Sequence, residues 1–195
     1  MKRLVDVIIS SLSILILLPI YAVVSLAILI IDGKPIFFIQ ERIGKNEKSF
    51  KLIKFRTMQN EISEITNEID KVTKFGSWLR KTSIDEIPTL INVLVGEMSI
   101  VGPRPLLVEY LIHYSDFQKK RHNIKPGITG WAQINGRNLI SWDKKFELDV
   151  WYVNNQSLIL DIKIIFLTFI KLLSQEGINN KTNNIVEKFK SKNEK

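Results

Sequence analysis

The chain has 195 residues, a formal net charge of +8 and a hydrophobic fraction of 45%, which is typical of one folded domain with an appendage and not of a disordered chain. It contains no cysteine, which excludes disulfides, thiolate metal sites and a cysteine nucleophile. A basic balance of this size favours anionic partners, such as nucleic acid, anionic lipid or phosphorylated small molecules.

The first predicted element is an apolar helix over residues 7–31, a run of 25 residues without a charge. It would be about 37 Å long, enough to cross a hydrocarbon core. Basic residues flank it on both sides, and because both flanks then favour the cytoplasm, a helix that enters and leaves on one side competes with a spanning helix. Pro19 lacks an N–H donor and is expected to kink or break the helix, although prolines are also tolerated in spanning helices.

The soluble part is predicted to be α+β and mostly helical. Residues 33–58 indicate two strands around a polar turn at 44–48, a small β-hairpin. Residues 59–74 are polar and are expected to be helical or mobile. Apolar residues at helical spacing then predict helices around 75–79 and 87–94. Residues 143–154 and a short segment ending in the basic run 119–122 are also predicted to be helical, and composition predicts turns at 102–105 and 126–130.

Residues 157–173 are apolar almost all round but carry Asp161, Lys163 and Lys171. This pattern fits a core helix, or a helix lying in the membrane interface whose lysines reach the headgroups. The polar residues 174–195 are expected to form a mobile tail. Other side chains are interpreted as structural or solvated: the tryptophans mainly as core, the histidines as surface or structural, and Lys119–Arg121 as a solvated face or a lipid contact.

An acidic pair, Asp85–Glu86, opens the apolar run that ends at Arg104 between two prolines. One interpretation is a helix N-cap, since Asp85 as the cap leaves Pro88 in the first turn. The other is chemistry, because phosphate also binds at helix N-termini and an Asp beside a Glu can hold Mg²⁺ together with substrate phosphate oxygens. Arginines in turn-like contexts suit phosphate binding, and the nucleotide motifs GxxxxGK[ST] and GxGxxG are absent from the sequence.

Four blocks carry a family resemblance: KFRTM (54–58), IDEIPTLINVLVGEMSIVGPRP (84–105), KPGITGWAQINGR (125–137) and LDIKIIFLT (160–168). Together they resemble the signature blocks of the bacterial sugar transferase family, the monotopic phosphoglycosyl transferases. The resemblance implies that a UDP-sugar donates its phospho-sugar to undecaprenyl phosphate and releases UMP. It also implies a re-entrant membrane helix, amphipathic interface helices and an active site at the cytoplasmic face of the bacterial inner membrane. The expected organisation is membrane helix 1–31, cytoplasmic catalytic domain 32–173 and tail 174–195.

The same resemblance implies roles for single residues. Asp85 would be the nucleophile that forms a covalent phospho-sugar intermediate, and Glu86 its partner in Mg²⁺ binding and activation. Further positions match family positions near the substrates: Lys51, Arg80, Arg104, Arg137 and Asp161. One departure is Leu18–Pro19, where the family commonly has Ser-Pro at the break of the membrane helix.

Similarity to short members that initiate protein N-glycosylation implies a UDP-N-acetylated sugar as donor and downstream glycosyltransferases as partners, with no role for nucleic acid. Two alternatives remain open. In one, Asp85 acts as a base for direct attack in a ternary complex. In the other, the chain is a membrane-anchored basic module that binds nucleic acid or acidic lipid without catalysis.

Overall fold

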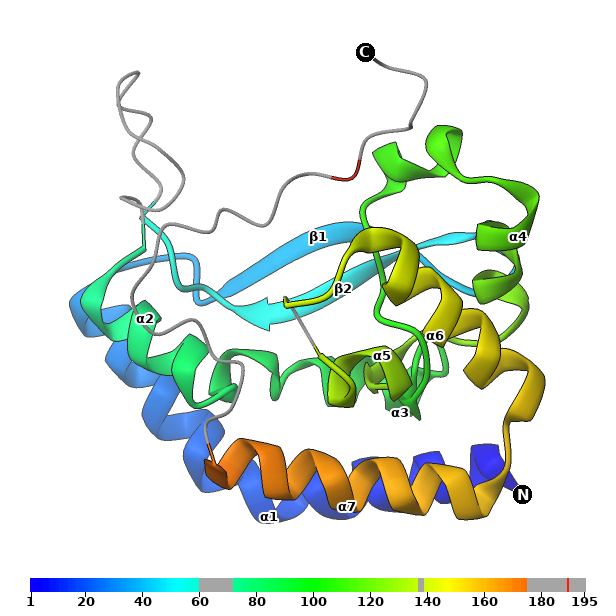
Figure 1. Ribbon diagram of the computed structural model, residues 1–195. Helices are drawn as coiled ribbons and strands as arrows, with labels where there is room; N and C mark the ends of the chain where they lie inside the picture. The colour runs from blue at the N-terminus through cyan, green and yellow to red at the C-terminus, as the bar shows by residue number, and fades with distance from the viewer. Residues whose placement is uncertain (60–71, 137–138, 175–188, 190–195) are drawn as a thin grey trace.

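The computed structural model describes residues 1–59, 72–136, 139–174 and 189 (Figure 1). This part of the chain is mostly helical, with an antiparallel hairpin and a second sheet of two short strands. In chain order the helices and strands are α1 Lys2–Ile31, β1 Phe37–Ile43, β2 Ser49–Phe55, α2 Lys74–Lys81, α3 Thr89–Val95, β3 Ser99–Val101, α4 Asp116–Lys119, β4 Gly127–Thr129, α5 Trp131–Ile134, α6 Trp142–Asn155 and α7 Leu158–Ser174. Short 3₁₀ turns lie between them at Lys45–Glu47, Ile84–Glu86, Val108–His113 and Lys120–Asn123.

The predicted hairpin is confirmed. Strands β1 and β2 pair antiparallel, with Phe37 opposite Phe55 and Ile43 opposite Ser49. Along β2 the side chains at positions 50 and 52 are buried while those at 49 and 51 are exposed, as the period of two in a strand requires. The turn follows Ile43, where Asn46 and Glu47 adopt left-handed backbone angles. The hairpin therefore has one face turned toward α3 and the core.

The pairing of β3 with β4 was not predicted. These strands run parallel, with Ser99 opposite Gly127 and Val101 opposite Thr129, so the turn predicted at 126–130 is wrong over the residues of β4. Gly127 makes the contact possible, because a Cβ atom there would lie 2.1 Å from the backbone nitrogen of Gly102. Glycine in this segment therefore allows two backbones to lie close together, and does not only mark a chain reversal.

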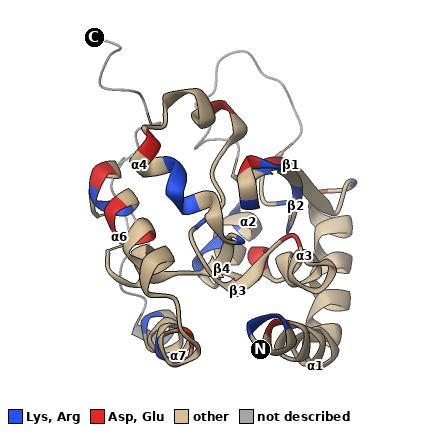
Figure 2. Ribbon diagram, turned by 90° about the vertical axis from the view of Figure 1, so that its right-hand side faces the viewer, with Lys and Arg blue, Asp and Glu red and all other residues tan. Residues whose placement is uncertain are grey.

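Helix α1 is continuous through Pro19, but its two halves run in different directions (Figures 1 and 2). Both ends of α1 contact the same folded domain. Near the first end, the Lys2 ammonium donates to the carbonyl oxygen of Val101 at 3.0 Å. At the other end, the guanidinium of Arg56 donates to the carbonyl oxygen of Gly33 at 2.7 Å. By length and composition α1 could cross a membrane.

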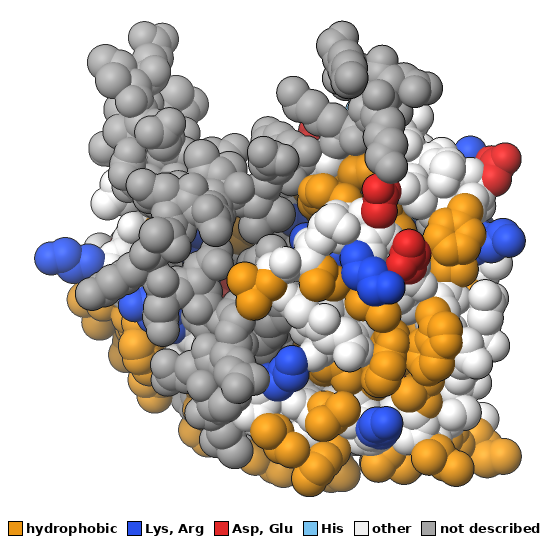
Figure 3. Space-filling model, in the orientation of Figure 1, with side chains coloured by type: hydrophobic (Ala, Val, Ile, Leu, Met, Phe, Trp, Pro, Cys, Tyr) orange, Lys and Arg blue, Asp and Glu red, His pale blue; other side chains and the backbone are white. Residues whose placement is uncertain are grey.

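Exposed apolar side chains follow α1 and α7, which lie along the same edge of the molecule (Figures 1 and 3). Helix α7 buries Ile164 and Asp161, and most of its exposed side chains are apolar. Its exposed apolar residues are Ile159, Ile162, Phe166, Phe169 and Ile170. A soluble protein rarely exposes so large a contiguous apolar patch, and such patches mark protein or membrane contacts. The long apolar helix and this surface indicate a membrane location.

The expectation for the basic run is wrong at Arg121, which was expected on a solvated face or at a lipid contact but is only 3% exposed. His122, interpreted as surface or structural, is buried beside it. The tryptophans were expected mainly in the core, but Trp151 is 43% exposed and stacks on Trp131 with ring centroids 5.0 Å apart. Within the expected tail the structure describes Ser174 and Phe189, and the latter is buried among aromatic side chains. Residues 60–71, expected to be helical or mobile, lie outside the described residues.

Candidate active site

The acidic pair lies in a 3₁₀ turn, Ile84–Glu86, between α2 and α3. Ser83 enters the turn with a left-handed φ of 57°, and Pro88 directly precedes α3. Of the two interpretations of the acidic pair, the helix N-cap is wrong, because the backbone N–H groups of Glu86 and Ile87 already donate to the carbonyls of Ser83 and Ile84. The Asp85 carboxylate makes no hydrogen bond or ion pair within the described part of the chain. It is therefore not used for capping.

Asp85 is buried, with 9% of its surface exposed. Burial raises the pKa of its carboxyl to about 6, and the neighbouring Glu86 charge acts in the same direction. The cations of Lys54, Arg80 and Arg104 oppose this rise. A carboxylate that combines a raised pKa, nearby cations and no hydrogen-bond partner among the described residues is a candidate for chemistry rather than for structure.

Glu86 has the opposite electrostatic balance. Its Oε1 atom accepts from the ammonium of Lys54 at 2.6 Å and from Nη2 of Arg104 at 2.8 Å. Burial alone would raise its pKa, but the charges of Arg104 and Lys54 outweigh burial and lower the pKa to about 2. Adjacent carboxylates whose pKa values are pushed apart are typical of sites where one group reacts and the other stays ionised.

Arg80 reaches the site from the last turn of α2. Its Nε donates to the Thr57 hydroxyl at 2.8 Å, and its charge acts on Asp85. Thr73 caps the N-terminus of helix α2, and its hydroxyl accepts from the N–H of Gly76. A Cβ atom at Gly76 would lie 2.1 Å from the carbonyl oxygen of Thr57. The close approach of α2 to the end of β2 therefore sets the position of Arg80.

A small cavity lies beside Glu86. Its charged lining side chains are Glu86 itself and three cations: Arg42, Lys54 and Arg104. Nη2 of Arg42 donates to the Gln40 amide oxygen at 2.6 Å, and its buried Nε has no hydrogen-bond partner among the described residues. An excess of cations over carboxylates around a cavity favours an anionic ligand.

Of the residues predicted for the site, Asp85, Glu86, Arg80 and Arg104 lie together. Lys51 points to the exposed side of β2, whereas Lys54, three positions along, reaches Glu86. Arg137 lies outside the described residues.

Lys54, Thr57 and Arg42 were missed as site residues. The period of two along β2 could have identified Lys54, because it shares a strand face with the buried Leu52 while Lys51 does not. The contacts of Thr57 and Arg42 join segments distant in the chain, so no local pattern marks them.

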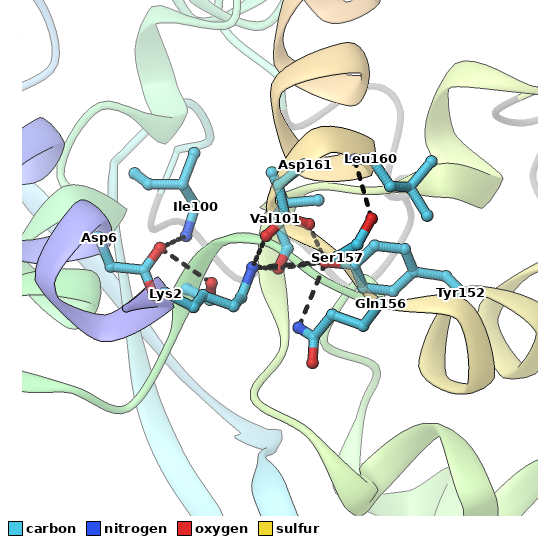
Figure 4. A network of polar contacts seen from close by, with 10 residues as sticks. Lys2, Asp6, Ile100, Val101, Tyr152, Gln156, Ser157, Leu160 and Asp161 are labelled. Carbon is cyan, nitrogen blue, oxygen red and sulfur yellow. Dashed lines mark hydrogen bonds and ion pairs between the residues drawn. The ribbon is translucent and has the colours of Figure 1, made fainter.

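Asp161 belongs to a different cluster, shown in Figure 4. Its carboxylate accepts from the Lys2 ammonium at 2.6 Å and from the Tyr152 hydroxyl. Nearby, Asp6 accepts from the Ser99 hydroxyl at 3.0 Å. These contacts join the first turns of α1 to α7 and β3, and they do not include Asp85 or Glu86.

Comparison with known proteins identifies the family. The family model for bacterial sugar transferases matches residues 1–175. An uncharacterized sugar transferase, EpsL of Bacillus subtilis (strain 168), is 55% identical over 160 residues, which are 80% of this chain and 79% of that protein. Exopolysaccharide production protein ExoY of Sinorhizobium fredii (strain NBRC 101917 / NGR234) is 38% identical over 187 residues, 86% of this chain and 83% of that protein.

A longer relative is the UDP-glucose:undecaprenyl-phosphate glucose-1-phosphate transferase of Escherichia coli (strain K12). It is 41% identical over 184 residues, which are 88% of this chain but 40% of that protein. The chain therefore spans less than half the length of this relative. The match of the family model over most of the chain shows that the protein belongs to the bacterial sugar transferase family and is an enzyme of that family.

Proposed function

We propose that the protein is a phosphoglycosyl transferase, which moves a sugar phosphate from a UDP-sugar to undecaprenyl phosphate and releases UMP. The observation that carries this function is the buried Asp85 carboxylate, which has no hydrogen-bond partner among the described residues and lies next in the chain to Glu86, a lining residue of a cavity with three cations. The E. coli relative carries the same donor and acceptor classes in its name. An anionic diphosphate donor and an anionic lipid acceptor both suit this cationic surrounding.

The proposed reaction has two steps. A carboxylate oxygen of Asp85 attacks the β-phosphorus of the UDP-sugar, a new P–O bond forms, and the bond from that phosphorus to the bridging oxygen breaks so that UMP leaves. A phosphate oxygen of undecaprenyl phosphate then attacks the same phosphorus and releases Asp85. A carboxylate nucleophile divides one difficult displacement into two easier ones. Arg80, Arg104 and Lys54 supply positive charge where the leaving phosphate gains negative charge.

Mg²⁺ is the cofactor that we propose for this site. Within the described residues no group of three or more His, Asp or Glu side chains could hold a metal, so a site built by the protein alone is not indicated there. Two carboxylates suffice when the substrate adds phosphate oxygens. The Asp85 carboxylate and the Oε2 atom of Glu86 accept no hydrogen bond from the described residues, and these oxygens would hold the ion. When bound, Mg²⁺ would neutralise the charge of the diphosphate.

We propose that α1 re-enters and does not span the membrane. A straight helix of 30 residues would be about 45 Å long and would place its ends on opposite sides of the bilayer. Here both ends are hydrogen-bonded to one folded domain. With the apolar face of α7 in the interface, Asp85 would lie near the headgroups of the cytoplasmic face of the inner membrane, where the phosphate of the lipid acceptor is found.

The test is UMP release from UDP-sugars in the presence of undecaprenyl phosphate and Mg²⁺. Asp85→Asn is expected to abolish release, because an amide oxygen is a far weaker nucleophile, while thermal melting in detergent stays within a few degrees of wild type. Asp116→Asn, an exposed aspartate on α4, is the matched control and should retain full activity. Full activity in Asp85→Asn would contradict the proposed role of Asp85 as the nucleophile.

Two further measurements refine the function. Incubation with donor labelled in the sugar, without acceptor, should leave label on wild-type protein and none on Asp85→Asn. Turnover without any adduct would favour direct attack in a ternary complex. A donor panel would test the expected N-acetylated sugar against UDP-glucose and UDP-galactose. The product would be the substrate of downstream glycosyltransferases.

A further inference from the structure

We propose that the buried pair Arg121–Asp149 positions Arg104 by holding its backbone carbonyl, an inference that rests on the proposed function. Nη2 of Arg121 donates to the carbonyl oxygen of Arg104 at 2.7 Å. The same guanidinium donates to Oδ2 of Asp149 through Nε at 3.1 Å and Nη2 at 2.7 Å. Arg121 and Asp149 are 3% and 4% exposed.

The backbone around Arg104 depends on such contacts because prolines flank it. Pro105 has no N–H to donate, so the carbonyls of this segment carry much of its anchoring. The Pro103 carbonyl accepts from the N–H of Gly127 at 3.0 Å, and the Pro105 carbonyl accepts from Arg42 at a longer 3.4 Å. Between them, Arg121 is the donor to the Arg104 carbonyl within the described chain. Its loss would free the residue whose side chain binds Glu86.

The Arg121–Asp149 pair is buried, although Arg104, the residue that it holds, is half exposed. The side chain of Arg104 is 49% exposed, and an exposed long side chain keeps many rotamers, so the position of its backbone sets the region that its guanidinium can reach. Arg121 is fixed by Asp149 on α6 and lies over the ring of Phe146, 5.6 Å from its centroid. The planar guanidinium can meet the carboxylate and the carbonyl together, which the single ammonium of a lysine would not do in the same geometry. Arg121 and Asp149 are thus positioning residues, and Arg104 is the group that meets the substrate.

The test is Arg121→Lys, which keeps the charge opposite Asp149 and removes the fork that reaches the Arg104 carbonyl. We expect kcat/KM for the UDP-sugar to fall roughly 10- to 100-fold, the scale of a misplaced binding group. UDP affinity by calorimetry should fall in the same direction. Lys144→Met, which breaks an exposed ion pair on α6, the helix that also carries Asp149, is the control and should change neither kcat/KM nor UDP affinity.

A double-mutant cycle separates positioning from simple stabilisation. If Arg121 acts through Arg104, Arg121→Lys should weaken UDP binding in the wild-type background and add almost nothing to Arg104→Ala. Equal losses of UDP affinity in both backgrounds would overturn the inference, as would a lower melting temperature with unchanged affinity and kcat/KM.

Asp149→Asn is the second variant if Arg121→Lys fails to fold, and the same non-additivity with Arg104→Ala is expected of it. Absence of UMP release from wild-type protein with every donor would defeat the proposed function instead. The cycle on UDP affinity needs no turnover, so it would still decide whether the pair positions Arg104.

Discussion

At the scale of single residues, adjacency in the chain hides a division of roles. Asp85 and Glu86 share one turn, yet burial raises the pKa of Asp85 to about 6, while Arg104 and Lys54 overcome burial and lower that of Glu86 to about 2. The two pKa values differ because Glu86 forms the ion pairs with both Lys54 and Arg104. At neutral pH Asp85 is mostly ionised, and among the described residues it has no ion-pair partner, as a nucleophile requires.

This division predicts a pH shift in Glu86→Gln. Replacing Glu86 removes the negative neighbour of Asp85 and leaves Lys54 and Arg104 without their carboxylate, and both changes lower the pKa of Asp85 from about 6. The carboxylate infrared band of protein labelled at aspartate, titrated in EDTA, should show a midpoint near pH 6 that moves to lower pH in the variant. Asp116→Asn should leave the midpoint in place, and an upward shift in Glu86→Gln would contradict this electrostatic account.

The two lysines of β2 give a matched comparison. Lys54→Met removes one of the two cations on Glu86 and is expected to lower UMP release roughly 10- to 100-fold, the worth of one charge-assisted hydrogen bond. Lys51→Met alters a side chain on the exposed face of the same strand and should cost much less. Steady-state kinetics of both variants check the order, and a larger loss from Lys51→Met would instead favour the role expected for Lys51 from the family resemblance.

At the scale of elements, the helices and strands that were predicted correctly are those whose own sequence pattern specifies them. The apolar residues on both sides of the polar turn at 44–48 correctly indicate the hairpin, and the helical spacing near 75–79 correctly indicates α2. Residues 143–154, also predicted helical, lie within α6. The β3–β4 pairing joins two strands of three residues, too short for a periodic signal. The pairing depends on the approach of two backbone segments that are distant in the chain. The Gly and Pro residues in and next to β4 instead predict a turn there.

The candidate site divides in the same way. Asp85, Glu86 and Arg104 lie within motifs and were predicted together. Their geometry was not, because the left-handed Ser83 and the 3₁₀ turn replace the expected helix cap. The support of Arg104 by Arg121 also escaped prediction, since a run of basic residues at 119–121 is typical of a solvated surface, and the buried partner Asp149 lies 28 positions away.

Helix α2 provides a prediction about an element. In Gly76→Ala the new methyl would lie 2.1 Å from the Thr57 carbonyl oxygen, so α2 must move away from β2 and weaken the contact of Arg80 with Thr57. We expect a loss of about 1–3 kcal/mol in the free energy of unfolding, the usual cost of overpacking, together with reduced turnover. Chemical denaturation in detergent measures the loss. Lys74→Ala, at an exposed position of the same helix, is the control, and unchanged stability in Gly76→Ala would contradict this packing.

At the scale of the whole molecule, the apolar helix is part of the fold. Val24 and Ile28 of α1 pack with Phe55 and Leu79 in one core cluster, and the Lys2–Asp161 pair fixes the first turn of α1 to α7 (Figure 4). A detached anchor would have neither contact. The depth of α1 in the bilayer should therefore determine the height of Asp85 above it, and catalysis on a lipid phosphate should depend on the bend of α1.

Pro19→Ala tests that dependence. With its N–H restored and the ring removed, α1 can straighten. A straight helix cannot keep both the Lys2–Asp161 pair and the bonds from Arg56 to the residues after α1. We expect a lower melting temperature and a loss of turnover with undecaprenyl phosphate.

Because the chain has no cysteine, topology can be measured with single introduced cysteines, one before Met1 and one in place of Lys48 in the hairpin turn. In wild-type protein in oriented vesicles, an impermeant maleimide should label both from the same side. In Pro19→Ala, a fraction of molecules should protect the N-terminal cysteine while Lys48→Cys still reacts. Labelling of the two wild-type sites from opposite sides would show that α1 spans the membrane, and Asp85 would then need another explanation for its access to the lipid phosphate.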